Sequence, residues 1–289
     1  MKLIYFFDLE GVIGLYTLED EKKCLELSLQ EINAVIEILS KYSEIELTFC
    51  DCHNNGKMNS VLKSNYSHIS FLSNIWQITR KNQYDYAIFT GFHAKEGAEG
   101  IFPHSFREEF EYVKLGKRIV RELEIFINYL NAFEIKTLLV SGDAAAIKEI
   151  AYINCEKNIG KSQIKNENIE EKYLQLEKSV EKAIKERNYY EPQKFDSSNV
   201  QLKFKHNVKN FENMEQEKRE GVIQYENTVQ FVQQLDSICS WLNREIYIAR
   251  IIRISRCNRE LYIKLCLNRE IKALLRKDVT LLTLSLIHI

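Results

Sequence analysis

Residues 3–13 read LIYFFDLEGVI, in which an apolar run over residues 3–7 is followed by an acidic pair, Asp8 and Glu10. A short run of large apolar residues is typical of a strand buried on both faces, as in a parallel sheet. Residues 22–42 then place apolar side chains at helical spacing, and residues 45–50, IELTFC, form a second apolar run. Together these segments predict a β-α-β unit at the start of the chain.

Two further strand-like runs follow the same plan. YDYAIFT spans residues 84–90 and IKTLLVS spans residues 135–141, and a helical stretch is predicted between them over residues 118–132. Strands that alternate with helices connect most simply as parallel neighbours that the helices cover. The sequence therefore predicts an α/β fold with a mainly parallel, helix-covered sheet, in a domain over residues 1–155.

The next part of the chain predicts a different arrangement. A helix is expected over residues 170–187. Residues 199–208 and 222–235 then indicate two or more strands and a helix. We interpret residues 156–242 as an α+β C-terminal extension.

The composition changes beyond residue 242. Residues 243–278 hold ten Lys and Arg against four Asp and Glu, which indicates a basic helical tail over residues 243–283 with a solvated face or a non-native origin. The last six residues, LSLIHI at 284–289, resemble translated sequencing-adapter sequence. We expect them to be non-native.

The charge balance excludes several classes of partner. With 40 Lys and Arg against 41 Asp and Glu, the formal net charge of −1 gives no reason to expect nucleic acid or a membrane surface. The N-terminus lacks the apolar core of a signal peptide, and no apolar run is long enough to span a bilayer. Seven scattered cysteines, an odd number, are expected to be free thiols. We therefore expect a cytoplasmic protein.

Acidic and histidine side chains gather where the predicted strands end. Asp8 and Glu10 close the first strand, and since residues i and i+2 of a strand face the same side, their carboxylates are expected to project together. His53 follows the second strand, while His93 and His104 follow the third. Ligands of an open α/β sheet collect at the carboxyl ends of its strands. These side chains are therefore expected to meet.

Glu122 is expected to join them from a helix. It belongs to RELEIF, residues 121–126, inside the predicted amphipathic helix. A carboxylate beside an apolar helix face is costly to bury unless a cation neutralises it.

Imidazoles and carboxylates without thiolates favour Zn²⁺ or a similar borderline metal. Asp8, Glu10, His53, His93 and Glu122 exceed what one tetrahedral catalytic site takes, so two metals sharing a bridging carboxylate are the economical arrangement. Two metals about 3.5–4 Å apart would activate a bridging water and polarise a carbonyl. That is the chemistry of amide hydrolysis.

A second hypothesis gives Asp8 another role. FFDLEGVI closely resembles the first motif of haloacid-dehalogenase-type phosphatases, in which this Asp is the nucleophile, and IFTG at 88–91 and LLVSGD at 138–143 could supply two later motifs. However, Glu10 stands where these enzymes have a second Asp, and GDAAAI offers no second carboxylate for Mg²⁺. The phosphatase scheme also leaves the histidines without a role.

The ordered set of motifs resembles the DppA-type D-aminopeptidases, a family of zinc metallopeptidases. The spacing of eleven residues between two histidines, the second within Pro-His-Ser-Phe, is the most specific element. The resemblance extends over about residues 1–242 and is carried by DLEGVIG (8–14), EINAVIE (31–37), DCHNNGKMN (51–59), GFHAKEGAEGIFPHSF (91–106), RELEIF (121–126) and SGD (141–143).

The resemblance implies a role for each candidate residue. It implies His104 as the catalytic histidine, which we interpret as a general acid/base or transition-state stabiliser. It also implies a homo-oligomer, a decameric ring whose inner chamber admits short peptides. The chain departs from the family pattern at Arg121, where a Gly is usual, and at Leu115-Gly116, where Asn-Gly is usual. The implied zinc ligands are Asp8, Glu10, His53, His93 and Glu122.

The principal hypothesis is therefore a dinuclear zinc aminopeptidase that hydrolyses short D-amino-acid-containing peptides with a metal-activated water. The alternative is a catalytically impaired homologue that binds metal or peptide without turnover. The phosphatase with Asp8 as nucleophile is the third hypothesis.

Overall fold

The computed structural model describes residues 1–53, 57–107, 109–147, 155–158, 168–187, 198–205, 222–235 and 237–240. The predicted basic tail and the adapter-like residues after it lie outside the described residues. The chain divides into two compact units, Met1–Gln233 and Gln234–Ile289. The sheets and the site described below belong to the first unit.

A parallel sheet forms the centre of this unit, which confirms the predicted fold class. Within the described residues it has six strands in the order β3-β2-β1-β4-β7-β8, and every neighbouring pair is parallel. Its strands are β1 (Lys2–Phe7), β2 (Glu46–Asp51), β3 (Ser70–Leu72), β4 (Tyr86–Phe92), β7 (Lys136–Asp143) and β8 (Cys155–Asn158).

The register of the central strands brings their carboxyl ends to one level. Phe7, the last residue of β1, pairs with Asp51 of β2 and with Thr90 of β4. Residues that follow these strands therefore emerge side by side at one edge of the sheet, where ligands of open α/β sheets bind.

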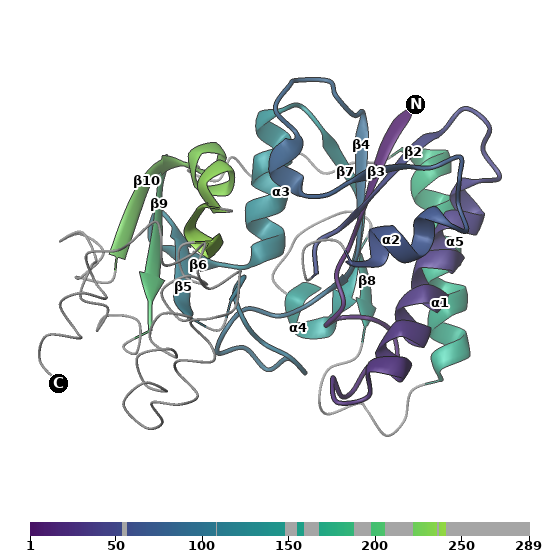
Figure 1. Ribbon diagram of the computed structural model, residues 1–289, viewed down its shortest axis with the longest axis horizontal. Coiled ribbons are helices and arrows are strands. Elements are labelled where there is room, and N and C mark those ends of the chain that lie inside the picture. The colour runs from purple at the N-terminus through teal and green to yellow at the C-terminus, as the bar shows by residue number, and fades with distance from the viewer. Residues whose placement is uncertain are drawn as a thin grey trace, which may run out of the picture. The chain divides into compact units, whose positions relative to one another are not determined.

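Helices cover both faces of the sheet (Figure 1). α1 (Glu21–Leu39) and α5 (Ile169–Glu186) pack against each other on one face, and α3 (Glu122–Ala132) lies on the other. Asp20 caps α1 by accepting a hydrogen bond from the amide of Lys23. Shorter elements are α2 (Lys57–Lys63), the 3₁₀ helix η1 (Ile75–Gln77) and α4 (Ala144–Ile147).

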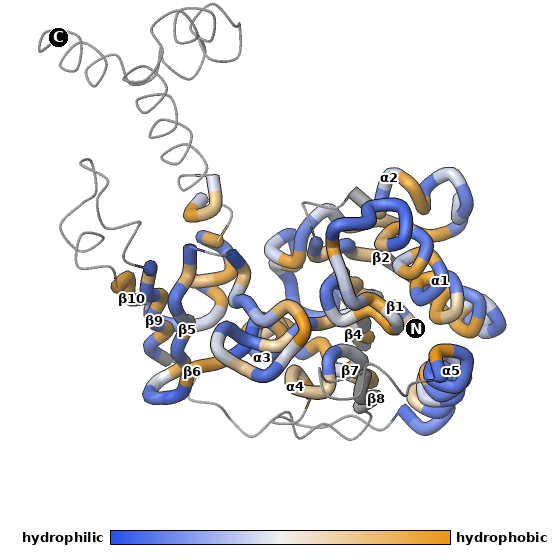
Figure 2. Tube along the Cα trace, turned by 90° about the horizontal axis from the view of Figure 1, so that it is seen from below, coloured by the Kyte–Doolittle hydropathy of each residue, from blue (hydrophilic) through white to orange (hydrophobic). Residues whose placement is uncertain are grey.

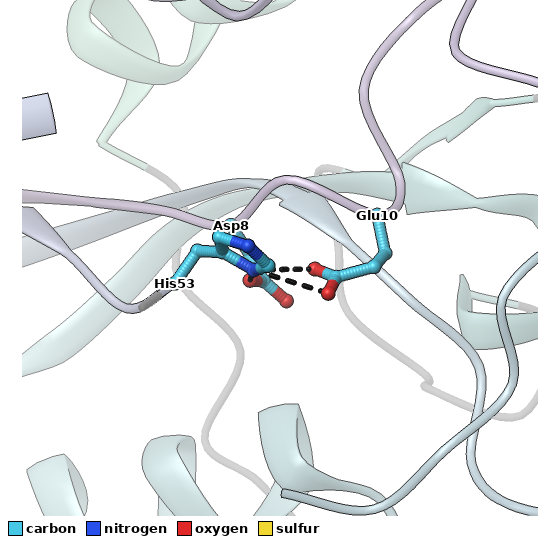
Figure 3. Close-up of side chains that lie close together, drawn as sticks. All are labelled: Asp8, Glu10 and His53. Carbon is cyan, nitrogen blue, oxygen red and sulfur yellow. Dashed lines mark hydrogen bonds and ion pairs between the residues drawn. The ribbon is translucent and has the colours of Figure 1, made fainter. Parts of the chain in front are cut away.

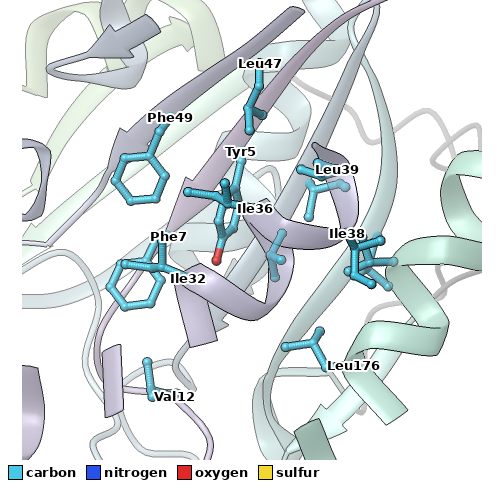
Figure 4. Packing of buried hydrophobic residues seen from close by; sticks show 14 of the residues in the cluster. Tyr5, Phe7, Val12, Ile32, Ile36, Ile38, Leu39, Leu47, Phe49 and Leu176 are labelled. Atoms are coloured by element: carbon cyan, nitrogen blue, oxygen red, sulfur yellow. The ribbon is translucent and has the colours of Figure 1, made fainter. Parts of the chain in front are cut away.

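The core lies between β1, β2, α1 and α5 (Figure 4). Every side chain from Leu3 to Phe7 is fully buried. Tyr5 packs edge-on against Phe49 of β2, with ring centroids 5.3 Å apart, and Ile32 and Ile36 of α1 cover them. Each such side chain contributes about 1.5–3 kcal/mol on burial, so β1 is a rigid support for the residues that follow it.

α5 shows how a helix closes this core. It buries a stripe of Tyr173, Leu176, Val180 and Ile184 at helical spacing. Most of its other residues are hydrophilic (Figure 2). In the part of the chain that the structure describes, no helix combines the length and apolarity needed to cross a membrane.

A second, antiparallel sheet lies beyond α3. Its order is β10-β9-β5-β6 among the described residues. The strands and the helix expected within residues 198–235 are present. However, β5 and β6 precede residue 155, so this sheet combines strands from both sides of the predicted domain boundary. The boundary itself stays a prediction. Its strands are β5 (Phe110–Leu115), β6 (Arg118–Val120), β9 (Ser198–Phe204) and β10 (Val222–Asn227).

The prediction of one helix over residues 118–132 is wrong in its first residues. Arg118–Val120 forms strand β6, and α3 begins only at Glu122. Leu115 pairs with Arg118, so β5 and β6 form a two-residue hairpin whose first turn residue, Gly116, has φ +57°. A glycine with positive φ at this position is typical of tight hairpins. β6 is extended because it pairs with β5. Three residues are too few to show the alternating pattern of a strand in the sequence.

An aromatic cluster joins the second sheet to α3. The ring of Phe106 packs against Phe126 of α3 at 5.7 Å, against Phe110 of β5 at 6.3 Å and against Phe231 at 5.6 Å between centroids. The cluster fixes the segment just after His104, so this loop is held against the N-terminal end of α3.

Candidate metal centre

Asp8 and Glu10 lie in a turn just beyond β1. The strand ends at Phe7, so the two carboxylates do not converge through i, i+2 strand geometry as the sequence argument assumed. Instead, the turn is tied to the end of β4 by hydrogen bonds from Asp8 N to the oxygen of Thr90 (2.9 Å) and from Gly11 N to the oxygen of Gly91 (2.7 Å). A Cβ on Gly11 would lie 2.1 Å from the Phe92 oxygen, so this close approach requires glycine.

Glu10 and His53 meet at the carboxyl end of β2 (Figure 3). Nδ1 of His53 lies 3.0 and 3.1 Å from the two carboxylate oxygens of Glu10 and 3.9 Å from Oδ1 of Asp8. One ligand atom from each of these three residues lies within 4.8 Å of the other two. This spacing suits a metal ion bound between them.

His93 and Glu122 meet on the other side of Asp8. Nε2 of His93 lies 3.5 Å from Oδ2 of Asp8 and 3.5 Å from Oε2 of Glu122. Nδ1–H of His93 donates to the oxygen of Ala94 (2.9 Å), which leaves Nε2 facing the carboxylates. Glu122 is the first residue of α3, where the helix dipole favours a carboxylate, and Phe106 N donates to its Oε2 (3.2 Å).

His104 stands next to these residues at the open side of the cluster. Its ring stacks on that of His93, with centroids 3.7 Å apart and planes at 9°. Nδ1–H donates to the oxygen of Phe102 (3.0 Å), and Nε2 lies 3.9 Å from Oε1 of Glu10. The side chain of His104 is 25% exposed against 3% for His93. Of the two imidazoles, His104 is the one that a ligand from solvent can reach.

The electrostatics of the cluster show how its buried carboxylates are neutralised when no metal is bound. Burial and the Glu10 carboxylate raise the pKa of Asp8 well above its usual value. Burial opposes ionisation of Glu10 too, but His53 and the two other imidazoles lower its pKa to about 2. Burial would depress the pKa of His93, yet Glu122 and Asp8 raise it to about 10, and Glu10 likewise raises the pKa of His53. Protonated imidazoles thus balance buried carboxylates, a role that metal cations can take over.

One buried atom supports the same view. Oδ2 of Asp8 makes no hydrogen bond to any residue that the structure describes, although it is shielded from solvent. A buried carboxylate oxygen without a donor is costly. A cation between Asp8 and His93 would satisfy it, so the residues present fit a bound metal.

Comparisons with known proteins show the family to which the chain belongs. A sequence profile of the D-aminopeptidase family, peptidase family M55, matches residues 1–234. The chain belongs to this family. Membership makes it a metallo-aminopeptidase, a hydrolase, and it confirms the resemblance seen in the motifs. It favours the metal interpretation of Asp8 over the phosphatase hypothesis.

The chain shares its fold with a solved structure. The chain matches the Zn-dependent D-aminopeptidase DppA from Bacillus subtilis, described as a self-compartmentalizing protease, with a TM-score of 0.67 and 18% sequence identity. The match covers 83% of this chain and 97% of that chain. A search of curated protein sequences gave no match.

The sequence did not reveal the role of Asp51 in this chain. Its Oδ1 accepts from the amide of His53 (3.0 Å), and its Oδ2 accepts from the amide of Met58 in α2 (2.8 Å). The carboxylate therefore joins the His53 loop to the first turn of α2. Asp51 ends β2 several residues before α2 begins, so no local capping signal points to it, and only the structure shows that it binds both backbone amides.

Arg121 stands where the family resemblance leads us to expect Gly, and its backbone is unstrained. Its φ of −90° and ψ of 162° are allowed for any residue, and it serves as N-cap of α3. The guanidinium is buried, with Nη1 3.4 Å from Oε2 of Glu124 and Nη2 donating to the oxygen of Ala145 (3.3 Å). The substitution therefore leaves Glu122 at the start of a regular helix.

We expect Arg121→Ala to lower the free energy of unfolding by about 3 kcal/mol, because removing one partner of a buried ion pair costs about 3–5 kcal/mol. Arg118 lies 2.7 Å from the same Glu124 carboxylate and still pairs with it in the variant, so the loss falls at the lower end of that range. Urea unfolding checks this, with Lys81→Ala as a control that removes only an exposed ion pair with Glu134. A stability equal to that of the wild type would contradict the assignment.

Proposed function

We propose that the chain is a dinuclear zinc aminopeptidase that hydrolyses short peptides containing D-amino acids. The observation that carries the proposal is the position of Asp8. Its Oδ1 faces His53, whose ring meets Glu10, and its Oδ2 faces His93, whose ring meets Glu122. A carboxylate between two such pairs is suited to bridge two metal ions.

The ligand count supports the same proposal. With Asp8 shared, one zinc ion would take Glu10 and His53, and the other would take His93 and Glu122. Each site then has three protein ligands of the kind that catalytic zinc prefers, with a position left open. When bound, the zinc ions supply Lewis acidity and lower the pKa of a water that attacks the peptide carbonyl.

His104 is proposed as the residue that moves the proton. Its Nδ1–H is held by the Phe102 oxygen, so its Nε2 points toward the open side of Glu10. From there Nε2, which has no hydrogen while Nδ1 carries the proton, can take a proton from the attacking water and then pass it to the leaving amine of the cleaved peptide bond. The buried carboxylates around it favour a substrate with a free ammonium group, which is the defining feature of an aminopeptidase substrate.

The proposal includes the setting of the enzyme. DppA is described as self-compartmentalizing, and we propose that this chain also forms a homo-oligomer, a decameric ring in line with the family resemblance, that admits only short peptides. We further propose that it acts in the cytoplasm.

Metal analysis and hydrolysis of matched dipeptides by the purified full-length chain test the function. We expect about two zinc ions per chain, release of amino acid from D-Ala-D-Ala faster than from L-Ala-L-Ala, and loss of activity with a chelator that zinc restores. Faster cleavage of the L-dipeptide would reject the proposed chirality. Full zinc occupancy without release of amino acid from either peptide would favour the catalytically impaired binding homologue.

A further inference from the structure

Glu31 is a buried carboxylate outside the metal centre. It lies on α1 and is 0% exposed, and its Oε2 accepts a hydrogen bond from the amide of Ile13 (2.8 Å). Among the described residues, none of the ion pairs of the chain includes Glu31, and the polar groups around it are the hydroxyl groups of Thr90, Tyr5 and Tyr173. The carboxylate therefore reaches from α1 to the turn after β1.

This carboxylate is a costly choice at its position. Burial raises the pKa of Glu31 to about 7, although the Ile13 amide and the Thr90 hydroxyl act in the opposite direction. The neighbouring helix positions Ile32 and Val35 are fully buried and apolar. An apolar side chain would serve the packing of α1 equally well, so the gain from Glu31 must lie in what it binds.

What it binds is the far end of the segment that carries Asp8 and Glu10. We call residues 8–13 the metal loop. Its near end is held by the hydrogen bonds from Asp8 N and Gly11 N to β4. Its far end is held at Ile13, whose amide donates to Glu31 and whose oxygen accepts from the Tyr173 hydroxyl at 3.5 Å. Glu10 lies between the two ends.

We propose that Glu31 is a positioning residue for the metal loop, and that its hydrogen bond to the Ile13 amide holds the Glu10 carboxylate facing His53 and His104. The inference rests on the proposed role of Glu10 as a zinc ligand. Supporting groups that orient a ligand without touching the metal change metal affinity by about 10–100-fold.

Three substitutions separate the hydrogen bond from the charge. Glu31→Gln keeps the length and an acceptor for the Ile13 amide but removes the charge. Glu31→Asp keeps the charge but is one methylene too short to reach Ile13, and Glu31→Met removes both acceptor and charge at similar volume. We expect zinc affinity to fall about 10-fold or more in the Asp and Met variants and to stay within about threefold of the wild type in the Gln variant.

Zinc affinity is measured by competition with a chromophoric chelator, and circular dichroism and thermal unfolding of the zinc-free proteins report folding. Wild-type zinc affinity in the Asp and Met variants would overturn the positioning role, as would lowered thermal stability without a change in zinc affinity. Loss of affinity in the Gln variant with retention in the Asp variant would also overturn it, because charge would then be the cause. Should the Met variant fail to fold, the Asp and Gln pair decides. Absence of zinc from the wild type itself would instead reject the proposed function, and this inference with it.

Discussion

A His93→Ala variant is expected to lose peptide hydrolysis almost completely and to bind at most one zinc ion per chain. Nε2 of His93 is the group that lies between Asp8 and Glu122, 3.5 Å from each. Without it, the carboxylates of Asp8 and Glu122 lose the imidazole between them, and the pKa of Asp8, which His93 lowers, rises further. Protons then compete more strongly with metal for the same oxygens.

The expected loss of kcat/KM is at least about 10³-fold, because Lewis-acid catalysis contributes several kcal/mol. Zinc per chain by atomic spectroscopy and hydrolysis of a D-dipeptide measure the two effects. His68→Ala is the matched control, since His68 is exposed, contacts the ring of Tyr66 and lies just before the amino end of β3, whereas the cluster gathers at the carboxyl ends of the strands. Circular dichroism should show both variants folded. Retention of both zinc ions in the His93 variant is the result that would remove His93 from the ligand set.

The sequence alone could predict which site residues lie at the ends of strands. Asp8, His53 and His93 follow buried apolar runs, and parallel strands deliver such residues to one edge whatever the details of the loops. The reason given for Asp8 and Glu10 was nevertheless wrong, because a turn tied to β4 brings them together. A hydrogen bond between backbone groups more than eighty residues apart leaves no local trace in the sequence.

The same limit explains what was missed elsewhere. β6 has three residues and exists through its pairing with β5, which in turn pairs with β9 about ninety residues later. The helical spacing of apolar residues in α3 led to a predicted helix that also included the residues of β6. The buried carboxylate of Glu31 was also hidden, because a Glu in an amphipathic helix is by default assigned to the solvated side. Only the fold shows that it faces Ile13.

A His104→Ala variant is expected to separate catalysis from metal binding. His104 contacts Glu10 only at 3.9 Å and otherwise stacks on His93, so its removal leaves all five proposed ligands in place. Zinc content should stay at about two per chain, while kcat falls about 10²–10⁴-fold, the usual contribution of a general acid or base. The lost stacking contact is worth only about 0.5–1.5 kcal/mol, too little to empty the site.

The measurements are zinc content, kcat and KM for a D-dipeptide, and calorimetric binding of the same peptide to the variant. We expect KM and peptide affinity to change much less than kcat, because a proton donor acts mainly in the transition state. A variant that loses zinc together with activity would make His104 a ligand, and the two-site division around Asp8 would have to include it. A variant with wild-type kcat would leave proton transfer to another group, and Glu10, the carboxylate that faces Nε2 of His104, would be the next residue to test.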